Sequence, residues 1–493
     1  MNFQTILIYT KSYSLRLKKA LYSLPVFAAL ILTPLPSQAQ DLANDSEVHA
    51  QIELFSAWLE GQIAIRDLPG IVVGVVSDQD LIWARGFGHA DLESNRLAET
   101  NTRFRMASHS KLFTATAIMQ LLEQNKLRLD DPVTDYLPWF YYQSAALDDP
   151  LITIEHLLTH SSGLPREAGP HWSDLDFPTT DELRGLISRR QAPFSPEVRW
   201  KYSNLAYTIV GMVIEEISGM SWAEYLQKNI FEPLNMNASS VDWEDPLLAT
   251  GYGRRMPDGS RAIMPFVDAR GMAAATGLTS TLEDMARFVS AQFRQGTRGG
   301  DRLLSTASLR EMHRVRMLEN TWTRGQGIGF SVSRIDDKIF VGHGGGYWGY
   351  RTSTSIQLDS KVGVIVLTNA DDSNPAQIVR QLMSTVGEAV AVATAVEPEV
   401  VPWDPEWERF AGVYLSRGGE TRVLVMNERL VTMNPWASSI EEPTELEPIG
   451  DGLFRMVAPT GGGPVGEIVR FVEDNGKVIR IITGDSFADR VRD

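Results

Sequence analysis

The chain of 493 residues contains no cysteine. Without cysteine it can form neither disulfide bonds nor thiolate metal sites, and it cannot use a cysteine nucleophile or a cysteine-linked lipid anchor. Basic residues are also comparatively few: there are 46 lysines and arginines but 62 aspartates and glutamates, which gives a formal net charge of −16. A protein this acidic should repel nucleic acid and anionic membrane surfaces. We therefore expect no nucleic-acid partner.

Long apolar runs are absent except near the N-terminus, in residues 1–39. Basic side chains between residues 11 and 19 precede the apolar run "ALYSLPVFAALILTPL", which is followed by the small residues Ser37 and Ala39. This pattern predicts a cleaved signal peptide and therefore export to the periplasm or the medium. The run is interrupted by proline and is shorter than the ~20 residues that a spanning helix needs. An uncleaved membrane anchor is the alternative interpretation.

The remaining length exceeds what one compact core usually contains, so more than one folded domain is expected. Helical spacing of apolar residues over 48–63 is followed by two strand patterns, "GIVVGVV" and "DLIWARGFGHAD". Region 104–295 has mostly helical patterns, and strand patterns return between 327 and 369. For residues 40–394 this order predicts an α+β domain, in which an antiparallel sheet is flanked by helices and carries an inserted helical subdomain.

The last part of the chain has a different pattern. The stretch "AVEPEVVPWDPEW" is rich in proline and acidic residues and predicts a linker at 395–407. Short strand patterns such as "RVLVMN", "GEIVRFVED" and "KVIRIITG" then alternate with turn residues over 408–493. They predict a small all-β, barrel-like accessory domain. Such a domain can shape a cleft, restrict substrate length or mediate contacts in a homo-oligomer, and its sequence does not distinguish these roles.

Ser108 and Lys111 stand at the start of a predicted buried helix, "ASHSKLFTATAIMQLLE". Positions three apart share a helix face, so the Lys111 amine can reach the Ser108 hydroxyl, whereas the neighbouring His109 points elsewhere. A lysine that loses its solvation in a cleft has a lowered pKa and can act as a base. This geometry favours a serine nucleophile with a lysine base over a Ser108–His109 pair. The alternative is that Ser108 only caps the helix.

Two further polar motifs lie far along the chain. Tyr202 and Asn204 precede an apolar helical pattern; a phenol can pass protons and an amide can bind a substrate amide. An aromatic residue followed by a helix cap would give the same pattern. A strand pattern leads into the run His343–Gly346, where glycine lets a substrate backbone lie close to the strand. The G-x-G-x-x-G match in this run is followed by a strand pattern, so it does not predict a dinucleotide site.

Other polar and aromatic residues carry weaker signals. His156 and His160 are spaced i, i+4, a geometry that can bind zinc. No H-E-x-x-H pattern is present, so we interpret the pair as packing or loop-bracing residues and expect no metal. Trp348, beside the glycines, either lines the substrate pocket or packs against the sheet edge. Neither a G-x-S-x-G elbow nor a Walker P-loop occurs, and no organic cofactor is expected.

Taken together and in this order, the three motifs resemble those of one family. S-x-x-K at Ser108 and Lys111, Y-x-N at Tyr202 and Asn204, and H-x-G at His343 are similar to the motifs of the penicillin-recognising serine hydrolases. This is the family of class C β-lactamases and their D-alanyl peptidase and esterase relatives. The stretches "ITIEHLLTHSSGLP", "GLTSTLEDMARF" and "GVIVLTN" also match family sequences. The resemblance covers residues 48–385 and implies the β-lactamase/transpeptidase-like fold.

The resemblance implies a catalytic role for several matching residues. Ser108 would be the acylated nucleophile, and Lys111 and Tyr202 would share general acid–base catalysis. Which of the two takes the serine proton stays open at this point. The backbone N–H groups of Ser108 and Gly346 would form the oxyanion hole, aimed at the charge that develops on the substrate carbonyl oxygen.

Substrate binding, by the same resemblance, would fall to Asn204, His343, Gly344 and Gly345. Asn204 would bind the substrate amide, and His343 would help Tyr202 and contact an acidic group of the substrate. Many relatives have lysine, a permanent cation, at the position of His343, whereas histidine is largely neutral at pH 7. Histidine at this position is familiar in relatives that act on D-amino-acid peptides. The resemblance therefore favours such a substrate over a dedicated β-lactamase activity.

These observations predict an exported serine hydrolase that acts through a Ser108 acyl-enzyme on amides or esters. D-amino-acid peptides or peptidoglycan fragments are the favoured substrates, so the partner would be a small peptide, a β-lactam or an ester. One alternative is a carboxylesterase for small acyl esters. Another is a non-catalytic receptor for β-lactams or muropeptides, against which the intact Ser108, Lys111 and Tyr202 argue.

Overall fold

A computed structural model describes residues 42, 44–241, 246–293, 303–395, 401–437, 443–450, 452–457 and 465–492. The predicted signal peptide, residues 1–39, lies outside these ranges. The chain divides into two compact units, Met1–Ala395 and Val396–Asp493. Within the described ranges, no helix combines the length and apolar character needed to cross a bilayer.

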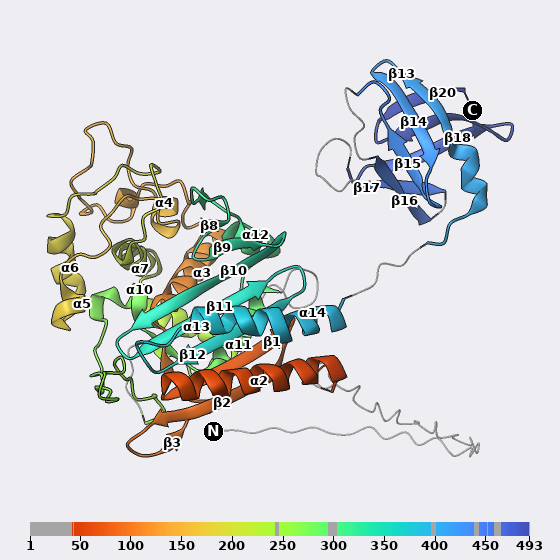
Figure 1. Ribbon diagram of the computed structural model, residues 1–493. Helices are drawn as coiled ribbons and strands as arrows, with labels where there is room; N and C mark the ends of the chain where they lie inside the picture. Colours follow the sequence, from red (N-terminus) through yellow and green to blue (C-terminus); the bar gives the residue numbers. More distant parts are fainter. Residues whose placement is uncertain are drawn as a thin grey trace, which may run out of the picture. The chain divides into compact units, whose positions relative to one another are not determined.

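The first unit is built on a nine-stranded antiparallel sheet with the order β3-β2-β1-β12-β11-β10-β9-β8-β7 (Figure 1). Its strands are β1 (Gly70–Ser77), β2 (Asp80–Asp91), β3 (Arg96–Leu97), β7 (Met317–Leu318), β8 (Arg324–Gln326), β9 (Ser331–Ile335), β10 (Lys338–Tyr347), β11 (Tyr350–Gln357) and β12 (Val362–Thr368). β1 pairs with β12, with Ile71 opposite Thr368. Strands from the two ends of the unit therefore lie side by side in the sheet, and the helical region is inserted between them in the sequence.

The terminal helices cover one face of this sheet (Figure 1). They are α2 (Ser46–Arg66), α13 (Pro375–Leu382), the π-helical turn η6 (Met383–Gly387) and α14 (Glu388–Ala393). β1 directs Ile71, Val73 and Val75 into this core and Val72 into the core on the opposite face. Because both faces are buried, β1 and β12 are almost unbroken apolar runs rather than alternating ones.

The inserted region packs against the other face. Its helices are η1 (Ala107–His109), α3 (Ser110–Glu123), η2 (Val133–Asp135), α4 (Ile154–Leu158), α5 (His171–Asp174), α6 (Thr180–Ile187), α7 (Asn204–Ser218), α8 (Trp222–Leu226), η3 (Gln227–Phe231), α9 (Glu232–Leu234), η4 (Arg270–Met272), α10 (Ala273–Thr276), α11 (Leu282–Gln292) and α12 (Thr306–His313). A Cβ on Gly74 of β1 would lie 2.8 Å from Leu282, and one on Gly363 of β12 would lie 2.3 Å from Val289. Glycine at these two positions lets α11 pack directly on the central strands.

A three-stranded sheet, β4 (Phe104–Arg105), β6 (Leu278–Ser280) and β5 (Ser240–Val241), completes the inserted region. β4 leads through η1 into α3, which is buried on nearly every side. A helix buried all round must be apolar all round, which explains the apolar sequence after Lys111. The predicted α+β architecture with an inserted helical subdomain is confirmed.

The second unit is a closed barrel of eight antiparallel strands in sequence order. They are β13 (Gly412–Ser416), β14 (Gly419–Val425), β15 (Leu430–Met433), β16 (Thr444–Gly450), β17 (Leu453–Val457), β18 (Ile468–Asp474), β19 (Lys477–Thr483) and β20 (Ser486–Arg492). β20 pairs back onto β13, with Val413 opposite Arg492, so the sheet closes. The 3-10 helix η7 (Pro405–Phe410) precedes the barrel, and Phe410 stacks on Phe471 with ring centroids 4.2 Å apart. The predicted barrel-like fold is confirmed, and its core is filled by side chains.

Candidate active site

A tight turn between β4 and α3 presents Ser108. In this turn, η1, Ala107 has a left-handed backbone with φ of 50°, a conformation that is costly for a residue with a side chain. The Ser110 hydroxyl helps to hold it: it donates to Ala107 O at 2.7 Å and accepts from the Leu278 N–H at 2.9 Å. Ser108 is partly exposed between the buried residues Ala107 and His109. The predicted first turn of the helix is thus a separate 3-10 turn, and α3 begins at Ser110.

His109 braces this turn against the sheet. Its Nδ1 lies 3.0 Å from Thr352 Oγ1 and its Nε2 lies 3.2 Å from Thr354 Oγ1, both on β11. Burial of the ring lowers the pKa of His109 to about 3, so the imidazole is neutral at ordinary pH. Both ring nitrogens of His109 contact threonines of β11, and neither contacts the Ser108 hydroxyl.

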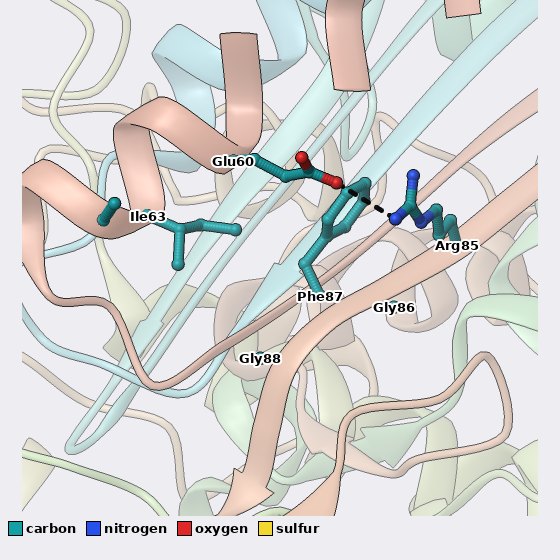
Figure 2. A pocket seen from close by; sticks show the side chains of 7 residues that line it. Glu60, Ile63, Arg85, Gly86, Phe87 and Gly88 are labelled. Carbon is teal, nitrogen blue, oxygen red and sulfur yellow. Dashed lines mark hydrogen bonds and ion pairs between the residues drawn. The ribbon is translucent and has the colours of Figure 1, made fainter. Parts of the chain in front are cut away.

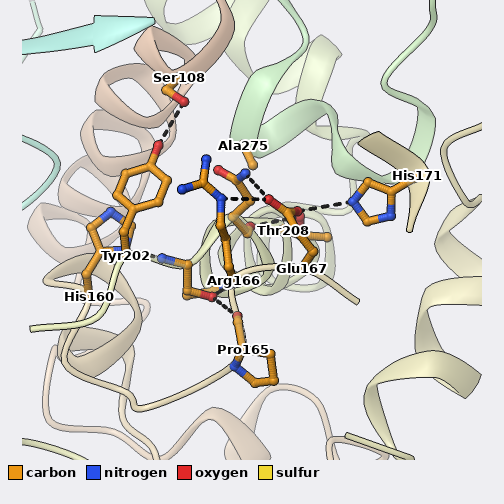
Figure 3. A network of polar contacts seen from close by, with 12 residues as sticks. Ser108, His160, Pro165, Arg166, Glu167, His171, Tyr202, Thr208 and Ala275 are labelled. Atoms are coloured by element: carbon orange, nitrogen blue, oxygen red, sulfur yellow. Dashed lines mark hydrogen bonds and ion pairs between the residues drawn. The ribbon is translucent and has the colours of Figure 1, made fainter. Parts of the chain in front are cut away.

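The structure brings Ser108, Lys111 and Tyr202 together. The Tyr202 hydroxyl donates to Ser108 Oγ at 2.7 Å (Figure 3), and Lys111 Nζ lies 3.2 Å from the same oxygen. Lys111 Nζ also donates to Asn204 Oδ1 and to Ala275 O, each at 2.8 Å. The serine hydroxyl therefore lies between a phenol and an amine that come from distant parts of the chain.

The surroundings of Lys111 and Tyr202 favour the neutral form of each group. Lys111 is fully buried, and this burial lowers its pKa well below the ordinary value. Burial likewise raises the pKa of Tyr202 to about 12. A neutral amine has two hydrogens, which the carbonyl-type oxygens of Asn204 and Ala275 can accept, and its remaining lone pair is then available to the Ser108 hydroxyl. The arrangement can move the Ser108 proton to Lys111 while Tyr202 keeps its own.

The Tyr202 ring is held by residues of the preceding loop. The His160 ring lies 4.4 Å from it, and the Arg166 guanidinium lies 5.2 Å above it. His160 Nδ1 accepts from the Ser203 N–H at 3.2 Å, and the Ser203 hydroxyl donates to Pro165 O at 2.7 Å (Figure 3). The loop that follows α4 thus fixes the approach of Tyr202 to Ser108.

The spaced histidines His156 and His160 have separate partners. His156 accepts from the Thr153 N–H at 3.2 Å in a capping box at the start of α4, and its Nε2 lies 3.2 Å from Glu197 Oε1. His160 lies beyond the end of that helix, against Tyr202. In the part of the chain that the structure describes, no group of three or more histidine, aspartate or glutamate side chains is arranged to hold a metal ion.

Asn204 is the first residue of α7, whose N-cap is Ser203. Both ends of its amide are engaged: Oδ1 accepts from Lys111 Nζ, and Nδ2 donates to Glu167 Oε1 at 2.5 Å. Glu167 is also 3.1 Å from His171 Nε2 (Figure 3). Glu167 belongs to none of the three motifs in the sequence. Its position directly after the "HSSGLPR" stretch is the one signal that points to it, because that stretch forms the loop under Tyr202.

The run His343–Tyr347 forms an open edge of β10. β9 pairs with β10 only from Lys338 to Gly342, so within the described residues this run has a strand neighbour on the β11 side alone. His343 is nearly buried, and its Nδ1 donates to Gly344 O at 2.6 Å. Burial and the nearby Lys111 lower the pKa of His343 to about 4. His343 is therefore a neutral imidazole and gives the site no permanent cation.

The three glycines of this edge meet different surroundings. A Cβ on Gly345 would lie 2.4 Å from Met106 O and 2.2 Å from Thr352 Oγ1, whereas one on Gly344 would meet Thr352 O at 3.6 Å, an ordinary contact. A Cβ on Gly346 would lie 2.5 Å from the end of a flexible arginine side chain, Arg351. Gly345 is therefore the position at which β10 needs glycine in order to lie against the Ser108 turn.

Trp348 belongs to an aromatic cluster at the end of β10. Its ring lies 4.8 Å from Trp172, 5.9 Å from Phe177 and 5.1 Å from Tyr347. Trp348 and Trp172 are partly exposed, and Phe177 and Tyr347 are buried. Trp348 thus packs in this aromatic cluster at the sheet edge, directly after the open run of β10.

A pocket of about 330 Å³ between α2 and β2 is separate from this site (Figure 2). Ile63 and Phe87 line it, and Glu60 forms an ion pair with Arg85 at 3.0 Å across it. α2 covers the terminal-helix face of the sheet, whereas Ser108 lies on the side of the inserted region. The pocket therefore has no part in the chemistry at Ser108.

Several known proteins are similar to this chain. The Beta-lactamase family model matches residues 55–383. Penicillin-binding protein 4* of Bacillus subtilis is 27% identical over 389 residues, which cover 71% of this chain and 80% of that protein. Esterase EstB of Burkholderia gladioli is 30% identical over 346 residues, which cover 62% of this chain and 86% of the esterase.

Two solved structures have the same fold. The octameric penicillin-binding protein homologue from Pyrococcus abyssi matches with a TM-score of 0.60 and 23% identity, over 89% of this chain and 99% of that one. A D-stereospecific amidohydrolase from Streptomyces sp. matches with a TM-score of 0.55 and 23% identity, over 65% of this chain and 95% of that one.

Proposed function

This chain belongs to the beta-lactamase family and is a serine hydrolase, and we propose that it is exported and acts on amides or esters through an acyl-enzyme on Ser108. The observation that carries the proposal is the series of contacts from the Tyr202 hydroxyl to Ser108 Oγ at 2.7 Å and on to Lys111 Nζ at 3.2 Å. A serine hydroxyl is a weak nucleophile until a base takes its proton. A buried lysine amine beside it can be that base.

In the proposed first step, Ser108 Oγ attacks the substrate carbonyl carbon and its proton moves to Lys111 Nζ. The backbone N–H groups of Ser108 and Gly346 stabilise the negative charge that develops on the carbonyl oxygen. Tyr202 donates its phenolic proton to the leaving nitrogen or oxygen as the bond to the carbonyl carbon breaks, and the proton on Lys111 restores the phenol. Water then attacks the carbonyl carbon of the ester on Ser108 and gives one proton to Lys111 Nζ. Lys111 passes this proton to Ser108 Oγ as the bond between Oγ and the acyl carbon breaks, which restores the serine hydroxyl and the neutral amine.

This assignment makes Lys111 the base and Tyr202 the acid. It rests on the directions of the two pKa shifts, because burial favours the neutral amine and the neutral phenol. Asn204 would hold the amine through its Oδ1. One hydrogen of its Nδ2 is directed at Glu167, and the other would be available to a substrate carbonyl.

D-amino-acid peptides or peptidoglycan fragments are the proposed substrates. A penicillin-binding protein and a D-stereospecific amidohydrolase are among the proteins that this chain is similar to. The neutral His343 supports this preference, since it offers no permanent cation to a β-lactam carboxylate. The open edge of β10 also supports it, because an extended peptide can add to a strand edge through main-chain hydrogen bonds.

The reaction is tested by labelling with a fluorophosphonate, which phosphonylates an activated serine with loss of fluoride. We expect one adduct per chain, located on Ser108 by mass spectrometry of the digested protein, and none in Ser108→Ala. Ser384→Ala, a change of an exposed serine, serves as the matched control and should be labelled like the wild type. Equal labelling of Ser108→Ala and wild type would contradict the proposal.

A carboxylesterase is the second candidate function. It is supported by Esterase EstB, which is 30% identical to this chain, and by a site that does not require a charged substrate. D-alanyl amides, short nitrophenyl esters and a chromogenic cephalosporin should be compared on one preparation. Turnover of the amides supports the peptidase, turnover of the esters alone supports the esterase, and a stable adduct without turnover supports a receptor.

Export and self-association complete the proposal. Export rests on the predicted leader, and the mature protein should then begin at Gln40, which N-terminal mass spectrometry of the secreted protein can test. Self-association is supported by the octameric homologue from Pyrococcus abyssi. Light scattering of the purified protein should then give a mass that is a multiple of the monomer.

A further inference from the structure

The proposed reaction leaves one nearly buried acidic group beside Lys111 without a role. The Glu167 side chain is 15% exposed. Its Oε1 accepts from Asn204 Nδ2 at 2.5 Å and from Arg166 Nε at 3.3 Å, and its Oε2 lies 3.1 Å from His171 Nε2 (Figure 3). His171 is itself buried. A carboxylate with this many fixed donors is held in one orientation.

We propose that Glu167 is a positioning residue that orients the Asn204 amide and, through it, the Lys111 amine that receives the Ser108 proton. The inference rests on the proposed function, because it assigns Lys111 the part of the base. Glu167 does not contact Ser108 in the structure and acts through its neighbours.

The orientation of Asn204 follows from hydrogen-bond chemistry. An ionised carboxylate only accepts hydrogen bonds, so the amide end that meets Glu167 must be the NH₂ group. Asn204 Oδ1 then faces Lys111 and accepts a hydrogen bond from Lys111 Nζ at 2.8 Å. If the amide were rotated, its NH₂ would meet the hydrogens of Lys111, and the amine would lose one of the two acceptors that direct its lone pair to Ser108. Glu167 thus fixes the orientation of the Asn204 amide that suits proton transfer, although it does not contact Ser108 itself.

The charge of Glu167 acts on the same amine. Burial lowers the pKa of Lys111, Glu167 raises it and Arg166 lowers it further. Several elements supply further titratable side chains that interact with Lys111: His109 in η1, His160 after α4, Tyr202 just before α7, Tyr207 in α7 and His343 on β10. The histidines have lowered pKa values and the tyrosines raised ones, so these five are neutral. Among these side chains, Glu167 is therefore the one whose charge raises the pKa of the Lys111 amine, and this makes the amine a stronger base.

The test measures the fluorophosphonate reaction of Ser108 as a function of pH. Fluoride leaves without needing a proton, so the rate reports the transfer from Ser108 to the base and not protonation of a leaving group. The labelling rate of the wild type should fall at low pH as Lys111 becomes protonated. We call this low-pH part of the rate profile its acid limb. Glu167→Gln keeps an acceptor for Asn204 but removes the charge. Its acid limb should move to lower pH by ~1 unit or more, which is the pKa shift that a nearby opposite charge typically causes.

The rate above the acid limb should fall as well. A weaker base and a less constrained amide should cost Glu167→Gln ~10–100-fold there, the usual effect of a group that orients a reacting side chain. The matched control is Glu197→Gln, which removes the same charge from another histidine-paired glutamate whose side chain is 74% exposed. Its pH profile should be that of the wild type.

Action through Asn204 is tested by a double-mutant cycle. Glu167→Ala should slow the reaction much more in the wild-type background than in Asn204→Ala, because no amide is left to orient. Additive effects of the two substitutions would overturn the positioning role. Glu167→Asp keeps the charge and should keep the wild-type acid limb even if Glu167→Gln is too unstable to measure. A shift of that limb in Glu167→Asp equal to that in Glu167→Gln would also overturn it.

The outcomes separate this inference from the proposed function. If the wild type is not labelled on Ser108, the proposed function fails. If the wild type is labelled and Glu167→Gln has the same acid limb and rate, the proposed function stands and the role of Glu167 is refuted.

Discussion

Replacing Gly345 by alanine should both destabilise the first unit and slow acylation, whereas alanine at Gly344 should not destabilise it. The two glycines are neighbours in the same motif, but their surroundings differ. A Cβ at Gly345 would lie 2.4 Å from the backbone oxygen of Met106, and one at Gly344 would meet its nearest atom at 3.6 Å. A carbonyl oxygen of the backbone cannot rotate away as a side chain can, so β10 and the Ser108 turn must separate.

The size of the effect follows from these distances. An ordinary Cβ contact begins near 3.4 Å, so the strand and the turn must move apart by about 1 Å. Overpacking of this kind costs about 1–3 kcal/mol, which lowers the unfolding temperature by several degrees in a domain of this size. A misplacement of about 1 Å between reacting groups can cost ~10²-fold in rate. The Gly346 N–H would be carried away from the substrate carbonyl with the strand.

Two measurements check this prediction. Calorimetry should give a lower unfolding temperature for Gly345→Ala and an unchanged or slightly higher one for Gly344→Ala, because alanine in a strand loses less entropy on folding than glycine by about 0.5–1 kcal/mol. Fluorophosphonate labelling of Gly345→Ala should be slowed at a temperature where the protein is still folded. Equal unfolding temperatures for the two variants, or wild-type labelling by Gly345→Ala, would refute the argument that β10 lies directly on the turn.

Two further predictions concern proton transfer and pH. Tyr202→Phe should slow amide hydrolysis by ~10²–10⁴-fold but slow the fluorophosphonate reaction much less, since fluoride needs no acid; equal losses in both assays would make Tyr202 the base instead. The buried His313, whose pKa is lowered to about 4 by burial, binds its proton more weakly in the folded than in the unfolded chain. The unfolding temperature should therefore fall as the pH decreases from the ordinary histidine pKa near 6.5 towards 4. In His313→Gln the unfolding temperature should fall less steeply over the same pH range. Identical slopes for the two proteins in a pH series of melting curves would argue against a buried neutral His313.

Much of the site could be predicted from the sequence because part of its geometry is local. Ser108 and Lys111 are three residues apart, and a single helical turn brings their side chains to the same side whatever the rest of the fold. The apolar runs of β1 and β12 likewise indicated strands, and the short strand patterns after residue 408 indicated a barrel. These inferences depend on the spacing of side chains along the backbone, which the sequence states directly.

The tertiary structure decided which chemistry that spacing can perform. Asn204 lies 93 residues from Lys111 in the sequence, and no local pattern could place its amide oxygen, the Ala275 carbonyl and Glu167 around one amine. The same holds for His343, whose neutrality comes from burial, and for Gly345, whose need for glycine comes from the Met106 carbonyl. A pKa depends on how much water and which charges surround a group, and a steric limit depends on what lies within 4 Å of it. Both are properties of the folded chain, so the sequence alone could not distinguish the proposed base, acid and positioning residue.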